Sequence, residues 1–266
     1  MMPRERFCTD WSKTTSANSL DNTIALWTRL GVLFGSRPAR TTPDMEHLLL
    51  DTARLAPSNA RLFYLAVTWV SQYGNFVARH RLKHLVEEKL SPEDHPVLGL
   101  LLKLAAKHGA SRELLIAADV CRKAQKPQPL FGVHCDSPEL KRIARNHACR
   151  EGLAWNLWVP DQLPKLDALR PARWVIQKNP TYLDRIVRKG DLRCSILLTL
   201  QHDVPNGRVE SETALARLCS ANRIAVRHAL DDLEREGCAL RKKVPQRRRT
   251  AIVLGKSVNP VRVERA

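Results

Sequence analysis

The sequence lacks any long run of apolar residues. The longest runs cover residues 62–70 and 97–106, and the second contains Lys103. A helix needs about 20 apolar residues to cross a bilayer, so neither run predicts a membrane span. Residues 1–10 are polar and lack the apolar core of a signal peptide. We therefore expect a cytoplasmic protein with no membrane partner.

Cysteine occurs seven times, at scattered positions and without a C-x-x-C pair. This usage is typical of reduced, buried thiols and does not indicate a disulfide framework. Side chains of the types that bind zinc occur at Cys121, His134, Cys135, His147 and Cys149. Their spacing fits no common zinc finger. We expect neither a metal ion nor another cofactor.

The short motifs of common catalytic and nucleotide-binding sites are also missing. The chain has no Walker A loop, no G-x-G-x-x-G, no G-x-S-x-G and no H-E-x-x-H. Adjacent acidic residues occur at Glu87-Glu88 and Asp231-Asp232. Neighbours in sequence point in different directions on a helix, so neither pair suits acid–base catalysis. We expect a protein that is not an enzyme and has no catalytic residues.

Positive charge is what the sequence has in excess. There are 44 Lys and Arg against 27 Asp and Glu, which gives a formal net charge of +17 and a pI of about 10.1. Such an excess favours a polyanionic partner, either a nucleic acid or an acidic membrane surface. Charge alone does not distinguish these partners from a merely basic protein.

The apolar pattern divides the chain into segments. Residues 1–19 read as a flexible tail. In residues 20–125 apolar side chains recur at intervals of three and four, with few strand signals, as in residues 24–34 and 62–73. This pattern predicts a domain of about five helices packed as antiparallel neighbours, the first running to Phe34 and ending at Gly35.

Residues 126–180 read as an irregular connector, because their prolines restrict helices to short pieces. The tryptophans of this segment, Trp155, Trp158 and Trp174, have Leu and Val neighbours and are expected to pack on a core. Stacking of these rings on nucleic-acid bases is the alternative.

Residues 181–256 read as a compact unit of three helices and a β-hairpin, followed by a tail over residues 257–266. Ser211 and Asn222 are good N-caps for the second and third helices, and Gly237 suits the end of the third. The expected helices cover residues 191–200, 212–218 and 223–236, and the expected strands cover residues 239–244 and 250–254. The overall prediction is a mainly α protein with a helical N-terminal domain and a C-terminal winged helix-turn-helix.

The second and third expected helices of this unit carry a family resemblance. The residues that carry it are Ser211-Glu212, Leu215-Ala216-Arg217, Asn222-Arg223, Val226-Arg227, Ala229-Leu230, Leu233 and Glu236-Gly237. In this register the segment resembles the winged helix-turn-helix of GntR-type transcriptional regulators, which implies binding of double-stranded DNA.

Three features depart from the family pattern. Ser220 stands where the family usually has Gly, Thr213 stands where a DNA-contacting Arg is common, and the wing lacks its usual Gly. The unit also lies at the C-terminus, whereas the family carries it at the N-terminus. The resemblance therefore implies DNA binding but not ligand sensing.

The chemistry of DNA recognition selects the candidate site residues. Arg223 and Arg227 are four residues apart and share a face of the third helix, where either can contact guanine O6 and N7. Ser211 caps a helix N-terminus that suits a phosphate, and basic residues cluster at the wing. The expected DNA-binding residues are Ser211, Asn222, Arg223, Arg227, His228, Lys242, Lys243, Arg247, Arg248 and Arg249.

The sequence thus predicts a sequence-specific regulator of transcription that acts as a repressor. A homodimer is expected, because one such unit reads few base pairs. The alternative is an interaction protein of the antitoxin type, from a toxin–antitoxin or defence module, that binds a protein partner through its helical domain and represses its own operon. RNA binding, and a winged helix used for protein contact, are further alternatives.

Overall fold

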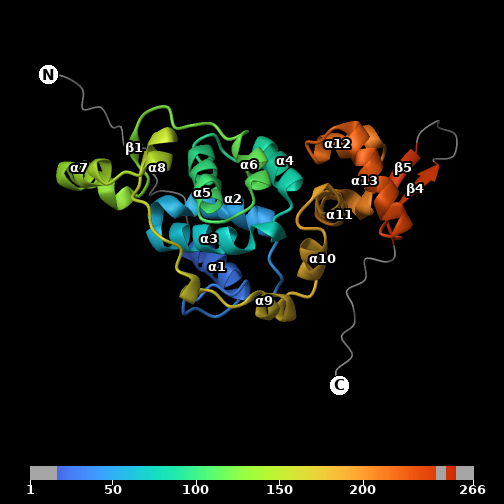
Figure 1. Ribbon diagram of the computed structural model, residues 1–266, viewed down its shortest axis with the longest axis horizontal. Coiled ribbons are helices and arrows are strands. Elements are labelled where there is room, and N and C mark those ends of the chain that lie inside the picture. Colours follow the sequence, from blue (N-terminus) through green and yellow to red (C-terminus); the bar gives the residue numbers. More distant parts are fainter. Residues whose placement is uncertain (1–16, 244–249, 256–266) are drawn as a thin grey trace.

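Helices dominate the computed structural model, which describes residues 17–243 and 250–255 (Figure 1). The expectation of a mainly α protein is confirmed. Buried apolar residues form two separate cores, one built from residues between Trp27 and Tyr182 and the other from residues between Ile196 and Ile252. Arg247, Arg248 and Arg249 lie outside the described residues, as do most of the two expected tails.

The first core is built mainly by helices from the N-terminal half of the chain. Their bounds are α1 (Ala17–Arg29), α2 (Met45–Leu55), α3 (Ala60–Tyr73), α4 (Arg79–Lys89), α5 (His95–Lys107) and α6 (Leu115–Ala118). α5 packs against α2, α3 and α6, and its apolar residues are buried around most of the helix. A helix that is apolar on most sides belongs inside a bundle, which explains its central place.

The first helix differs from the expectation at both ends. It begins at Ala17, within the segment expected to be a tail, and it ends at Arg29, so the prediction that it runs to Phe34 is wrong. Gly31 adopts a φ of +89°, a left-handed conformation that glycine accepts readily and that stops the helix. The chain after it forms an isolated bridge between Val32 and Leu169.

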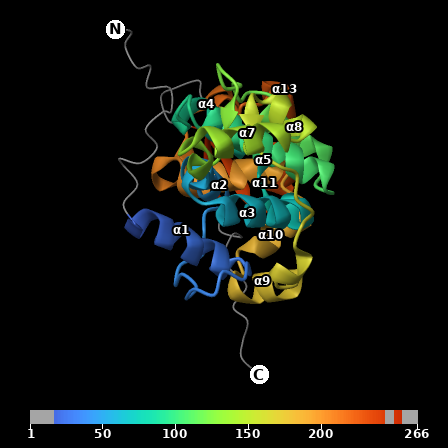
Figure 2. The same ribbon diagram turned by 90° about the vertical axis from the view of Figure 1, so that its left-hand side faces the viewer.

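The connector crosses the outside of this bundle in short pieces. These are α7 (Pro138–Asn146), α8 (Arg150–Ala154) and α9 (Ala172–Lys178), with a parallel bridge between β1 (Gln128–Pro129) and β2 (Leu157–Trp158). Figure 2 shows α9 beside α1, where Arg29 Nε donates to Asn179 Oδ1 at 3.1 Å. Short 3-10 turns complete the joins in the described part of the chain: Ala56–Ser58, Gly74–Phe76, Arg112–Leu114, Gly132–Cys135, Leu166–Ala168 and Pro205–Gly207.

Trp155 shows how the connector is held. Its ring is buried in the first core and lies against Gly99 of α5, where an added Cβ would come within 2.2 Å of the ring. The absence of a side chain at Gly99 therefore leaves the room that the indole fills. The expectation that Trp155 packs on a core is confirmed.

The second core belongs to the C-terminal unit. Its helices are α11 (Leu192–His202), α12 (Glu212–Leu218) and α13 (Arg223–Arg235), and its antiparallel sheet has the order β3 (Arg208–Val209), β5 (Thr250–Leu254), β4 (Ala239–Lys243). The three helices and the strands β4 and β5 lie close to the ranges that the sequence predicts. α10 (Tyr182–Val187) precedes them, but its Tyr182 is buried in the first core.

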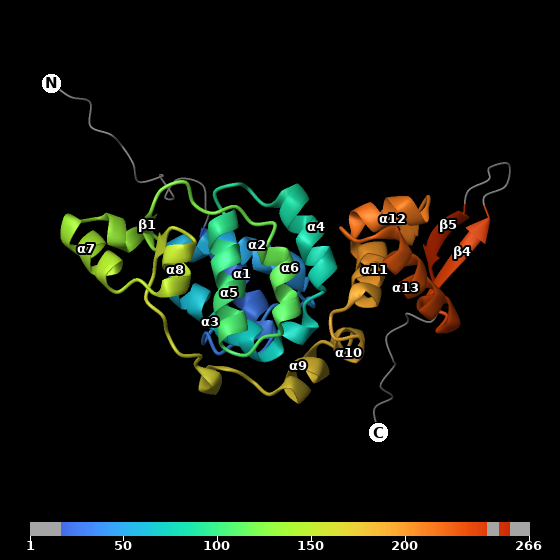
Figure 3. The ribbon, with the colours of Figure 1, turned by 45° about the horizontal axis from the view of Figure 1, so that its top comes forward.

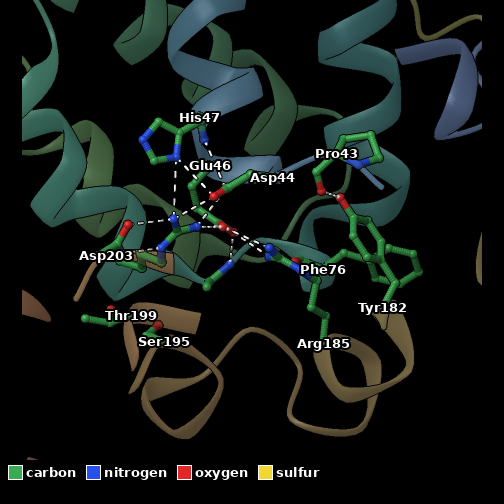
Figure 4. A network of polar contacts seen from close by, with 12 residues as sticks. Pro43, Asp44, Glu46, His47, Phe76, Tyr182, Arg185, Ser195, Thr199 and Asp203 are labelled. Atoms are coloured by element: carbon green, nitrogen blue, oxygen red, sulfur yellow. Dashed lines mark hydrogen bonds and ion pairs between the residues drawn. The ribbon is translucent and has the colours of Figure 1, made fainter. Parts of the chain in front are cut away.

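A buried network of charges joins the two cores (Figure 4). Arg81 of α4 is fully buried and forms ion pairs with Asp44, with Glu46 of α2 and with Asp203 at the end of α11. Arg185 of α10 pairs with the same Glu46, at 2.6 Å. Burial alone would raise the pKa of Asp44, but hydrogen bonds from His47 and Arg81 outweigh it and hold the pKa well below its usual range.

Candidate nucleic-acid interface

α13 is the element on which the candidate interface depends. Asn222 caps it by accepting a hydrogen bond from the Ile224 backbone N–H at 2.7 Å. Its buried stripe consists of Val226, Ala229, Leu230 and Leu233, as the spacing predicts. After the helix, Gly237 has a φ of +71°, the left-handed conformation expected there. One face of α13 is thus fixed on the second core, and the opposite face is left for contact.

α12 and the turn before α13 set the angle of that helix. The Ser211 hydroxyl accepts from the Ala214 N–H at 3.2 Å, which confirms Ser211 as the N-cap of α12. Ser220 in the turn has a φ of +41°, a region that glycine enters most easily. This explains why glycine suits the position. The Ser220 hydroxyl forms a hydrogen bond with Glu87 of α4.

The residues of α13 that are expected to contact base edges lie on its exposed face. The side chain of Arg223 is 60% exposed and that of Arg227 is 52% exposed, and His228 beside them is exposed as well. The structure therefore brings together three of the residues that the sequence singles out, and each of the three side chains is exposed.

Glu212 is a part of the site that sequence reasoning missed. Its carboxylate lies 3.2 Å from Arg227 Nε, 3.8 Å from Arg223 Nε and 3.1 Å from Arg241 Nε. One residue at the start of α12 therefore holds both candidate reading arginines and the root of the β-hairpin. A signal was present, since Glu212 follows a predicted N-cap, but its distance in sequence from Arg241 hid the contact.

Arg241 joins the β-hairpin to α13. Its guanidinium pairs with Asp231 at 2.7 Å and with Glu234 at 2.6 Å, and it donates to the Arg227 carbonyl at 3.1 Å. Partial burial lowers the pKa of Arg241, but the hydrogen bonds to Asp231 and Glu234 raise it by more. Arg241 is therefore engaged within the protein, and its role is to fix the hairpin against the helix.

The hairpin carries exposed lysines on β4. β4 pairs with β5 from Ala239 opposite Leu254 to Lys243 opposite Thr250, and both Lys242 and Lys243 are exposed. The lysines are held on a paired strand that Arg241 ties to α13. The charges expected at the tip, Arg247, Arg248 and Arg249, belong to the part of the chain outside the description.

The acidic residues near this surface form ion pairs with arginines of the same protein. Asp232 pairs with Arg235, and Glu236 pairs with Arg188 at 2.7 Å. Asp231 and Glu234 pair with Arg241, and Glu212 pairs with three arginines, as described above. Each acidic residue from Glu212 to Glu236 is thus in an ion pair, but Arg241 is shared by Glu212, Asp231 and Glu234. The ion pairs therefore reduce the negative charge of this surface without cancelling it.

The surface faces away from the helical domain. α11 and α12 carry contacts to α4, whereas α13 packs against α11, α12 and β4. Figure 3 shows α13 and the hairpin on the side of the C-terminal unit that is remote from α4 and α5. Most of α13 and β4 thus lies away from the bundle, although the turn before α13 contacts it, because Ser220 forms a hydrogen bond with Glu87 of α4.

The residues considered for zinc do not converge. Within residues 17–243 and 250–255, no three His, Cys, Asp or Glu side chains come close enough to hold a metal ion. Burial raises the pKa of Cys121 to about 12, so this thiol stays protonated at neutral pH. In the same residues, no helix combines the length and apolar content that crossing a bilayer requires.

The chain matches no family model, no curated protein and no solved structure. The functional argument therefore depends on the geometry of the surface itself.

Proposed function

We propose that α11, α12, α13 and the hairpin form a winged helix-turn-helix and that this unit binds double-stranded DNA in a sequence-specific way. The observation that carries the proposal is the exposed first half of α13, where Arg223 and Arg227 lie one helical turn apart on a face free of the core. The biological role that fits this activity is repression of transcription by occupation of an operator.

The major groove is wide enough for one helix, and its guanine edge offers two acceptors to a guanidinium. Arg223 and Arg227 lie one helical turn apart, so they would contact different base pairs along the groove. Lys242 and Lys243 lie on the adjoining strand, where they would contact phosphates or the minor groove. The N-terminus of α13, capped by Asn222 and without an acidic residue in its first turn, suits a backbone phosphate. Ser211 would contact a phosphate only beside Glu212, which begins α12.

The direct test is selection of preferred duplexes from a randomised pool by the full-length chain, followed by binding measurements with variants. Arg223→Ala and Arg227→Ala should each cost about 1–3 kcal/mol on the selected duplex and relax the preference at particular positions. Binding to a scrambled duplex should change much less, because a base contact contributes little there.

Arg235→Ala is the matched control. Arg235 is an exposed arginine of the same helix and pairs with Asp232, and it lies about 18 Å from Arg223 along the axis. We expect it to leave the selected sequence unchanged. A pool that yields no enriched duplex contradicts the proposal, as does an equal loss of specificity in all three variants.

The assembly and the alternative role stay predictions. A homodimer formed through residues 20–180 would double the length of DNA that is read, and light scattering of the chain with and without duplex checks it. An antitoxin-type role predicts a stoichiometric protein partner bound to the helical domain, and RNA binding predicts competition by double-stranded RNA.

A further inference from the structure

Ile224 is a feature of α13 that a role based on arginines leaves unexplained. Its side chain is 64% exposed, although it is a large aliphatic residue in the first turn of a helix whose apolar stripe is otherwise buried. The helix has no need of an exposed isoleucine here, because Val226 and Leu230 already fill the core side. Its neighbour Ala225 is also exposed, and its small size permits close approach to the helix.

The position of Ile224 relative to the arginines narrows its role. Residues three and four apart are neighbours on a helix surface, so Ile224 lies beside Arg227 and His228. The apolar side chain of Ile224 therefore lies next to the side chains that would contact base edges. Isoleucine is branched at Cβ and has few accessible rotamers, so fixing it in a contact costs little conformational entropy.

The edges of the bases offer one apolar group in the major groove, the C5 methyl of thymine. Removing this methyl and part of Ile224 from water together is favourable by the hydrophobic effect. We propose that Ile224 is a specificity-determining residue that contacts the methyl group of a thymine in the major groove. The inference rests on the proposed function and deepens it, because it assigns a base type to a position that the arginines do not read.

Replacement of thymine by uracil provides the test, since it removes the methyl and keeps the base pair. The probe is the duplex that the full-length chain enriches from the randomised pool, with each thymine replaced in turn. We expect one position in each bound half-site at which uracil weakens binding of the unaltered chain about fourfold, the effect of one buried methyl group. Ile224→Ala should bind the thymine and uracil duplexes equally well at that position.

Val187→Ala is the matched control, because Val187 is an aliphatic residue of α10 that is 66% exposed. It should keep the fourfold preference for thymine. Since Ile224 is outside the core, the melting temperature of Ile224→Ala should equal that of the unaltered chain, which excludes a folding defect as the cause.

The outcomes separate the two proposals. If an enriched duplex exists but no thymine position responds to uracil, the assignment of Ile224 is overturned and sequence-specific binding stands. The same holds if Ile224→Ala keeps the preference. If the chain enriches no duplex, the proposed function and this inference both fall.

Discussion

At the scale of single residues, one carboxylate positions the candidate reading groups. Glu212 contacts Arg223, Arg227 and Arg241 from the first turn of α12. A long arginine side chain loses rotamer entropy when it binds a base. Because Glu212 already restricts the arginine side chains in the free protein, less entropy is lost on binding. If the proposed DNA binding holds, Glu212 acts through the arginines and not by touching DNA, because its negative charge disfavours contact with phosphates.

We expect Glu212→Gln to lower specificity and raise non-specific affinity. The amide keeps the shape of the side chain but not its charge, so the arginines are held less firmly while the surface becomes more positive. The ratio of affinities for the selected and scrambled duplexes should fall about tenfold, which is within the range of one good base contact. Titration of both duplexes with the variant measures this ratio.

Glu210→Gln separates positioning from charge. Glu210 is exposed two residues before Glu212, and its replacement changes the net charge by the same amount. If it lowers the ratio as much as Glu212→Gln does, the positioning role of Glu212 is wrong.

At the scale of elements, we expect α13 to contact bases and the hairpin to contact phosphates. α13 presents side chains from a rigid helix, whereas β4 presents Lys242 and Lys243 from a strand that packs on that helix. A base contact depends on geometry, but a lysine near a phosphate acts mainly as a point charge. The two elements should therefore differ in their response to sequence and to salt.

The double variant Lys242→Ala/Lys243→Ala should weaken binding to selected and scrambled duplexes alike. The slope of log K against log salt should fall by about one unit for each phosphate that the variant no longer neutralises. Salt titrations on both duplexes check this. Lys178→Ala, at the end of α9 in the helical domain, is the control and should leave the slope unchanged. If Lys242→Ala/Lys243→Ala weakens binding mainly to the selected duplex, these lysines contact bases and the prediction is wrong.

At the scale of the whole molecule, the charge network fixes the C-terminal unit on the helical domain. Arg81 Nε lies 2.7 Å from Asp203 Oδ2, and a second N–H of Arg81 donates to Asp203 Oδ1 at 2.9 Å. Arg81 is fully buried, and it pairs with Asp44 and Glu46 on the side of the helical domain and with Asp203 on the side of the C-terminal unit. The two cores are therefore expected to unfold together.

Asp203→Asn should uncouple them and destabilise the protein by about 1.5–3 kcal/mol, because it weakens the two hydrogen bonds that Arg81 donates to the Asp203 carboxylate. The six tryptophans all precede residue 175, so tryptophan fluorescence reports on the helical domain while circular dichroism reports on all helices. In urea, the two signals should coincide for the unaltered chain, and circular dichroism should change first in the variant. Asp184→Asn, an exposed residue of α10, serves as the control, and coincident transitions in Asp203→Asn would refute the coupling.

The network also predicts a dependence of stability on pH. The pKa of Asp44 is held well below its usual range, whereas in the unfolded chain it is about 3.9. The unfolded state therefore takes up a proton first as pH falls, so the contribution of Asp44 is complete above about pH 5 and declines below about pH 4.

Asp44→Asn should be less stable than the unaltered chain by about 1.5–3 kcal/mol at pH 6, the range for a hydrogen bond to a charged group. The difference should shrink by about pH 2.5, because the variant has no carboxylate to protonate at this position. Urea denaturation at both pH values measures it. Asp51→Asn changes a surface carboxylate of α2 and is the control, which should lose as much stability in acid as the unaltered chain does. If the stability difference between Asp44→Asn and the unaltered chain is as large at about pH 2.5 as at pH 6, the prediction is wrong.

The local features of this protein follow from its sequence. The caps at Ser211 and Asn222, the buried stripe of α13 and the left-handed Gly237 depend on neighbours within a few residues, where side-chain spacing and backbone preference decide the outcome. The same local physics places Arg223 and Arg227 on one face. The prediction for the end of the first helix was wrong, because Leu30 and Phe34 continue the apolar spacing and the sequence pattern does not reveal the left-handed conformation of Gly31.

Only the tertiary structure decided the contacts between distant residues. Nothing near Glu212 in the sequence indicates that it meets Arg241, and nothing near Arg81 indicates that Asp203 approaches from another unit. Trp155 finds its place because Gly99 leaves room on α5. Such contacts depend on how whole elements pack, which is set by the sum of many small burial energies and not by any local pattern. The sequence determined which residues α13 offers to a partner, and the packing of α11, α12 and β4 around α13 decided how those residues are held.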